Sequence, residues 1–322
     1  MVFLSFLRLS RLRPAEEIFD TVASLIATYV RSLTFTRDEE RAFSGSPFDL
    51  FLSKNNLPRK PEDETALAYS RRLRTLIEGL SSPQFVTPAD GSFQFHAQDF
   101  AFGAEELAGL KLFLAEPETT TGSAGNCIAC HHTPNFTDFA FHNTGASQQE
   151  YAAIHGQGTF AALTIPDLET RNANFEAFLP PTTAHPTASG RFVSPPFADQ
   201  PELTDLGVWN IFANPDKPNP QEKIEQVLVR LHSTLPKNEL LSKAIAVFKT
   251  PGLRDLGQSA LYLHTDGKDT LSDIIQFYID MADLVRAGKV RNPDAKIGRI
   301  RLTPDDITPL RSFLRSLNED YS

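Results

Sequence analysis

The chain has only two cysteines, Cys127 and Cys130, and the second is followed directly by His131. This C-x-x-C-H sequence is typical of covalent haem attachment. Cysteines at positions i and i+3 can share one face of a helical turn and reach the two vinyl groups of a porphyrin. A histidine at i+4 is then placed to reach the iron through an imidazole nitrogen. The spacing predicts one covalently bound haem c, attached through Cys127 and Cys130, with His131 as the proximal iron ligand.

Three other uses of these cysteines stay open on the sequence alone. A structural zinc site normally has four nitrogen or sulfur ligands, and His132, His142 and His155 are the residues that would have to complete it. A thioredoxin-like redox pair would follow a strand and open a helix in a βαβ unit, and the sequence gives no sign of one. A disulfide across three residues closes too short a loop to stabilise the fold much.

Apolar residues recur every three or four positions in several segments, which predicts amphipathic helices. Residues 156–220 are rich in Pro, Thr, Ala and Asn and have no sustained period, so we expect long ordered loops there. The sequence therefore predicts a mainly α protein with long ordered loops. Helices are expected from Pro14 to Leu33, over about 65–78 with Gly79 as the stop, over 105–116, and after Pro220, Thr270 and Pro304.

Composition and charge exclude some partners. The 322 residues carry a formal net charge of −9 and no dense Lys/Arg run, which argues against nucleic acid as the main partner. There is no run of about 18 apolar residues, so no transmembrane helix is expected. The first residues, MVFLSFLRLSRLRPAEE, make a poor signal peptide, because Arg8 interrupts a short apolar stretch and no small-residue cleavage site follows.

Several stretches occur in a recognisable order along the chain. GLKLFL precedes the cysteines, FHNTG follows them, and DLGVWN comes next. Then come FKTPGLRDLGQSALYLHTDGKDTLSDIIQFY, which is residues 248–278, and the closing LTPDDITPLRSFLRSL. Upstream lie YVRSLTF and SPFDLFL. Together, over about residues 15–318, they resemble the bacterial dihaem cytochrome c peroxidase / MauG-like family, specifically its second haem domain and the segment that joins the two domains.

The resemblance implies a fold, a domain division and an activity. Residues 1–103 correspond to a helical inter-domain region or remnant of the first haem domain, and residues 104–322 to a cytochrome c-like helical haem domain. The implied protein is a periplasmic oxidoreductase, because haem is attached to such proteins outside the bacterial cytoplasm. It transfers electrons through its haem, with hydrogen peroxide as a candidate oxidant and a small cytochrome or cupredoxin as redox partner.

The chain also departs from this family. Members carry two C-x-x-C-H motifs and this chain has one, so we expect either that the first haem domain has been lost or that Met1 is a misassigned start. The family's calcium site uses a Thr-x-Pro just before Tyr-x-His, and here Ser259-Ala260-Leu261 stands in its place. These residues offer little support for a calcium site.

The resemblance also implies residues around the haem. The sixth iron ligand lies on the helix after Tyr-x-His, where Tyr278 stands, with Met281 as its rival three residues later. Tyr278 and Met281 also belong to a core-facing helical stripe, so core packing is the alternative for both. His264 is expected near the haem. Lys249 and Arg254 are expected to pair with the haem propionates, and exposed surface charges are the alternative.

The sequence thus predicts a c-type haem oxidoreductase, and the resemblance adds hydrogen peroxide as its candidate oxidant. Two further classes stay open: a monohaem electron carrier without catalysis of its own, and a non-haem protein whose cysteines hold zinc or a disulfide.

Overall fold

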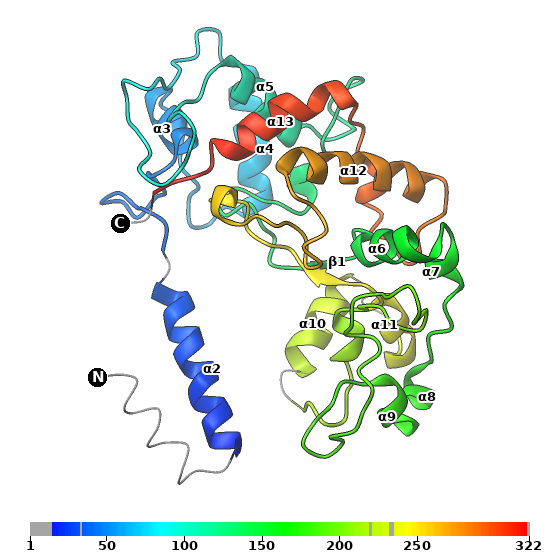
Figure 1. Ribbon diagram of the computed structural model, residues 1–322. Coiled ribbons are helices and arrows are strands. Elements are labelled where there is room, and N and C mark those ends of the chain that lie inside the picture. Colours follow the sequence, from blue (N-terminus) through cyan, green and yellow to red (C-terminus); the bar gives the residue numbers. More distant parts are fainter. Residues whose placement is uncertain (1–14, 33, 219–220, 232–234, 321–322) are drawn as a thin grey trace. The chain divides into compact units, whose positions relative to one another are not determined.

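The computed structural model describes residues 15–32, 34–218, 221–231 and 235–320 (Figure 1). It divides into two compact units, residues 1–45 with 321–322, and residues 46–320. The described part of the first unit is helix α2 (Ala15–Ser32) and a turn in which Arg37 bridges to Phe43. The second unit contains both cysteines and every predicted site residue, and the expected boundary between residues 103 and 104 falls inside it.

The described chain is mainly helical, as predicted, and its two short strands form one antiparallel pair. Within the predicted loop region, the described residues 156–218 form short helices joined by loops. The helices of the second unit are α3 (Pro47–Lys54), α4 (Ala66–Glu78), α5 (Ala104–Leu114), α6 (Ala146–His155), α7 (Thr159–Ala162), α8 (Leu168–Ala173), α9 (Phe175–Phe178), α10 (Gln221–Leu231), α11 (Lys237–Lys243), α12 (Leu271–Arg286) and α13 (Ile307–Arg315). The 3₁₀ turns are η1 (Cys127–Ala129), η2 (Val208–Asn210), η3 (Leu256–Gln258), η4 (Ile297–Arg299) and η5 (Pro304–Asp306).

Local capping chemistry places the helix starts. The Thr65 hydroxyl accepts from the Ala68 N–H at the start of α4, and Gly79 ends that helix, as predicted. Thr270 opens α12 with a capping box to Asp273. Thr303 makes the same box with Asp306 at η5, which leads into α13. Pro14, Leu33 and Pro220, named in the helix predictions, lie outside the described residues.

Helices α5 and α13 pack side by side and α4 lies against α5 (Figure 1). The contact is close at Gly109, where a Cβ atom would lie 1.9 Å from the carbonyl oxygen of Pro309. Around this crossing is an aromatic core that includes Phe48, Phe113 and Phe313. Ile128, in the middle of the C-x-x-C-H turn, is fully buried in the same core. The core therefore fixes the turn that carries the cysteines.

Two strands join this region to the rest of the unit. β1 (Phe141–His142) pairs antiparallel with β2 (Phe248–Lys249), so FHNTG lies beside FKTPGLR although about a hundred residues separate them. A second core surrounds Trp209, and a third surrounds Met281 on α12. In the described part of the chain, no helix has both the length and the apolar character needed to cross a bilayer.

Candidate cofactor site around Cys127 and His131

The C-x-x-C-H segment forms one tight turn. η1 places the Cys130 N–H 3.2 Å and the His131 N–H 2.8 Å from the Cys127 carbonyl oxygen. The preceding Asn126 has a positive φ of 51°, which bends the chain into the turn. Both cysteines are free thiols, and burial together with the neighbouring Cys130 sulfur raises the pKa of Cys127 to about 12. The turn thus presents two thiols and one imidazole from five consecutive residues.

The His131 imidazole is held in one orientation. Its Nδ1 lies 2.8 Å from the carbonyl oxygen of Phe136, so Nδ1 carries the hydrogen and donates it. Burial lowers the pKa of His131 to about 4, which keeps the ring neutral at neutral pH. In this tautomer the lone pair of Nε2 is available to a metal. Metal-ligating histidines commonly have their other ring nitrogen fixed in this way.

The loop that supplies the Phe136 carbonyl is anchored from two directions. From α4, the Ser70 hydroxyl lies 2.9 Å from the Thr133 N–H, which donates to it. From the 248–278 stretch, Arg254 Nε donates to the Pro134 carbonyl oxygen at 2.9 Å. His131 is therefore positioned through a loop that is itself fixed by buried polar contacts.

Arg254 is anchored in turn by Asp49 of α3. The guanidinium makes two 2.9 Å hydrogen bonds to the two oxygens of the Asp49 carboxylate, and both side chains are buried. This bidentate geometry is the strongest form of an arginine–carboxylate contact. The structure therefore gives Arg254 a role in anchoring the loop, and its contact with a propionate stays a prediction. Asp49 had no signal in the sequence beyond its place near a helix start.

Tyr278 lies in the third core on α12, half-buried, with its ring 5.1 Å from that of Phe277. Burial raises the pKa of its hydroxyl, and the nearby thiols of Cys130 and Cys127 raise it further. The phenol is thus within electrostatic reach of both cysteines. Among the described residues, none forms a hydrogen bond with Tyr278 Oη.

Met281, the rival of Tyr278, is completely buried. Its methyl group packs against Gly145, where an added Cβ atom would approach Met281 Cε to 2.1 Å. Gly145 has a φ of +89° and ends the FHNTG stretch, so a glycine suits both the backbone and the contact. Met281 therefore has a packing role in the core, and its role as an iron ligand stays a prediction.

The other predicted residues lie near the strand pair. His264 is exposed and stacks on Phe248 with ring centroids 3.5 Å apart. Lys249 is exposed, donates to the Thr250 carbonyl oxygen, and lies 5.5 Å from the centroid of the Phe139 ring. Both residues therefore lie on or beside β2.

A buried charge cluster, which we call the His142 cluster, lies directly beside Cys130. It consists of His142 on β1, Asp138 four residues earlier, and Asp294. Nε2 of His142 lies 2.8 Å from Asp138, and Nδ1 makes a short hydrogen bond to Asp294. Burial alone would lower the pKa of His142, but these hydrogen bonds and the Cys130 sulfur raise it to about 11. The same contact holds the pKa of Asp138 below its ordinary value despite burial.

In the sequence, His142 stands out only as a candidate zinc ligand together with His132 and His155. In the described chain the atoms with metal-ligand character come together differently, from Cys130, Asp138 and His142. The spacing of four between Asp138 and His142 was a usable signal. Asp294 had none, because it lies 152 residues from its partner.

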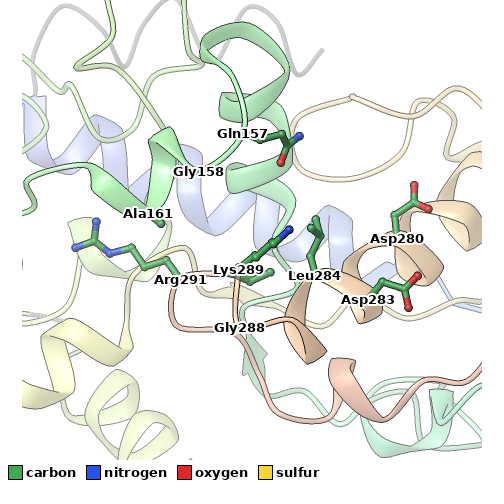
Figure 2. A pocket seen from close by; sticks show the side chains of 10 residues that line it. Gln157, Gly158, Ala161, Asp280, Asp283, Leu284, Gly288, Lys289 and Arg291 are labelled. Carbon is green, nitrogen blue, oxygen red and sulfur yellow. The ribbon is translucent and has the colours of Figure 1, made fainter.

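A separate cavity of about 790 Å³ lies beside the C-terminal half of α12 (Figure 2). Asp280 and Asp283 line it from the helix, and Lys289 and Arg291 line it from the loop that follows. None of the residues predicted to bind haem is among its lining residues. Its mixed acidic and basic wall does not select a ligand of one charge.

No protein-family model, curated protein or solved structure matches this chain.

Proposed function

We propose that this protein is a c-type haem oxidoreductase that transfers electrons through one haem attached to Cys127 and Cys130. The observation that carries the proposal is the fixed His131 tautomer, with Nδ1 donating to Phe136 and the Nε2 lone pair available. A zinc ribbon or a redox dithiol does not require a histidine prepared in this way directly after the second cysteine. The resemblance to the cytochrome c peroxidase / MauG-like family supports the same conclusion.

When bound, haem c supplies a one-electron redox centre. The residues of the chain have separate tasks around it. The two cysteines would hold the group covalently and His131 Nε2 would ligate the iron, while the Phe136 carbonyl keeps the imidazole oriented and increases its basicity. The phenol of Tyr278, near the thiols and without a described hydrogen-bond partner, would be a second iron ligand. We place the protein in the periplasm, with a small cytochrome or cupredoxin as partner.

Attachment is tested by producing the full chain with an export signal in cells that contain the haem c maturation machinery. We expect a Soret band that survives acid-acetone extraction, which removes non-covalent haem. Replacing both cysteines with alanine should abolish the band, whereas His132→Ala, the matched control beside the ligand, should retain it. A wild-type chain without covalent haem would overturn the proposal.

The position of Tyr278 near both cysteines also favours a second candidate, a monohaem electron carrier. If Tyr278 closes the sixth position, hydrogen peroxide has no access to the iron and the protein only relays electrons. Peroxide-dependent oxidation of a reduced cytochrome separates the two functions. Turnover in the wild-type protein supports the peroxidase, and turnover that appears only in Tyr278→Ala supports the carrier.

A further inference from the structure

The His142 cluster brings three different metal-ligating atoms together. One ligand atom each from Cys130, Asp138 and His142 lies within 4.8 Å of the other two. They come from the C-x-x-C-H turn, the loop after it and strand β1, so tertiary structure rather than a single motif assembles them. A thiol, a carboxylate and an imidazole are the ligand types that zinc and related first-row divalent ions prefer.

The second nitrogen of His142 is already held as in a metal site. Asp294 accepts the hydrogen bond from Nδ1, which leaves Nε2 facing Asp138. A carboxylate behind a histidine fixes the ring and increases the basicity of the ligating nitrogen. Asp294 is itself placed by Asn143, whose carbonyl oxygen accepts the Asp294 N–H at 3.0 Å. The ligand His142 and the residue that places its orienting carboxylate, Asn143, are thus neighbours in the motif FHN.

The charges of the His142 cluster match a divalent cation. Two aspartates are balanced by the His142 imidazolium and by Lys296, whose Nζ lies 3.9 Å from Asp138. A divalent ion placed among these ligand atoms would bring positive charge next to the two carboxylates. The side chains of His142 and Asp138 are only 3% and 9% exposed, so such balance is needed there.

We propose that the chain with Cys130 as a free thiol binds one zinc-class divalent ion through Cys130, Asp138 and His142. Asp294 acts as a positioning residue, and a water molecule fills the fourth place of a tetrahedral site. A further consequence, which rests on the proposed function, is that haem attachment and binding of this ion exclude each other. During haem attachment the Cys130 S–H adds across a vinyl double bond, so that one S–C bond forms and the proton goes to the other vinyl carbon. The Cys130 thiolate is then no longer available as a metal ligand.

The test is a titration of the full, reduced, haem-free chain with Co²⁺, a coloured substitute for Zn²⁺. We expect one equivalent to give ligand-field bands and a thiolate-to-cobalt charge-transfer band with the intensity of a single Co–S bond, and we expect Zn²⁺ to displace the cobalt. Cys130→Ser should lose the charge-transfer band. Asp294→Asn should keep the band but weaken Zn²⁺ binding by about 10- to 100-fold, as expected for a residue behind a ligating histidine.

The matched control is Cys127→Ser, which should bind Co²⁺ with an unchanged spectrum. Loss of the band in this control, or two Co–S bonds in the wild type, would overturn the proposal in favour of a cysteine-pair chelate. A wild-type chain that gives no band would overturn it outright. These outcomes are independent of the haem-attachment assay, so a failure here leaves the proposed function standing, and the reverse also holds. Circular dichroism of each variant reports whether it has folded.

Discussion

At the scale of single residues, the molecule contrasts two buried histidines that lie near the same cysteine. His131 has one carbonyl partner and is neutral, whereas His142 lies between two carboxylates and is protonated. Burial disfavours the charge of both rings, and only the carboxylates of the His142 cluster overcome it. The neutral His131 ring can bind a metal ion directly. The proton on the His142 ring occupies a position that a metal cation can take instead.

The raised pKa of His142 predicts a pH dependence of stability. Its value is about 11 in the folded chain against 6.5 unperturbed, so its stabilising contribution is complete below pH 6.5 and is lost as pH rises toward 11. In the haem-free chain, His142 alone should lower the free energy of unfolding by at most about 1.4 kcal/mol per pH unit in that window. Urea unfolding from pH 6.5 to 9 should show a flatter profile for His142→Gln.

The control for this experiment is His185→Gln, because His185 also pairs with an aspartate, Asp216, but its side chain is 34% exposed. Its pH profile should follow that of the wild type. Equal slopes in His142→Gln and the wild type would show that the His142 cluster does not hold its proton as described.

The haem-loaded protein gives a prediction for Tyr278. If the phenolate ligates iron, Tyr278→Phe should change the optical and EPR spectra, because the sixth ligand is lost. It should also raise the reduction potential by more than about 59 mV, a tenfold change in a one-electron equilibrium. Met281→Leu, a conservative change in the core, should leave both unchanged. A spectrum that changes only with Met281 would assign the ligand to methionine.

At the scale of elements, the buried ion pair between Asp49 and Arg254 connects α3 to the loop that orients His131. Breaking such a pair by removing one partner costs about 3–5 kcal/mol, because the other charge stays buried and uncompensated. We therefore expect Asp49→Asn to lower the free energy of unfolding by about that amount. Lys54→Ala, which removes the surface pair with Asp90, should cost less than about 1 kcal/mol. Equal decreases in the free energy of unfolding for Asp49→Asn and Lys54→Ala, measured by urea unfolding, would contradict this role of the buried ion pair.

The crossing of α5 and α13 depends on the missing side chain of Gly109. Gly109→Ala would force a methyl group to within 1.9 Å of a backbone carbonyl, so the two helices must separate. Overpacking of this kind costs about 1–3 kcal/mol, and a lower thermal midpoint should report it. Gly79→Ala is the matched control, since its Cβ meets no atom closer than 3.5 Å and its φ of −81° suits alanine. An unchanged thermal midpoint in Gly109→Ala would mean that α5 and α13 can move apart without loss of stability.

The helix starts and the buried pairs differ in how far they could be predicted from the sequence. Thr65, Thr270 and Thr303 predicted helix starts because a cap depends on neighbours three residues away. The C-x-x-C-H turn was likewise predicted from local spacing. Arg254 with Asp49 and His142 with Asp294 lie 205 and 152 residues apart, and no local pattern encodes such pairs. For Arg254 the sequence therefore offers a propionate or solvent as partners, and the Asp49 carboxylate became visible only in the folded chain.

At the scale of the whole molecule, the net charge of −9 bears on the choice of redox partner. A protein of this charge attracts cationic partners over distances that salt shortens, from about 30 Å at 0.01 M to about 8 Å at 0.15 M ionic strength. For the haem-loaded protein, we expect the second-order rate constant of electron transfer with a basic cytochrome to fall about tenfold over this range.

Stopped-flow mixing of the reduced protein with the oxidised cytochrome measures this constant directly. An acidic cytochrome of similar potential is the matched control, and its rate constant should rise or stay level as salt screens the repulsion. If the basic and acidic partners respond alike, a local charged patch, rather than the summed charge, governs the encounter. Lys249 on β2 is then the first charge to test, because of the two predicted propionate partners it is the exposed one.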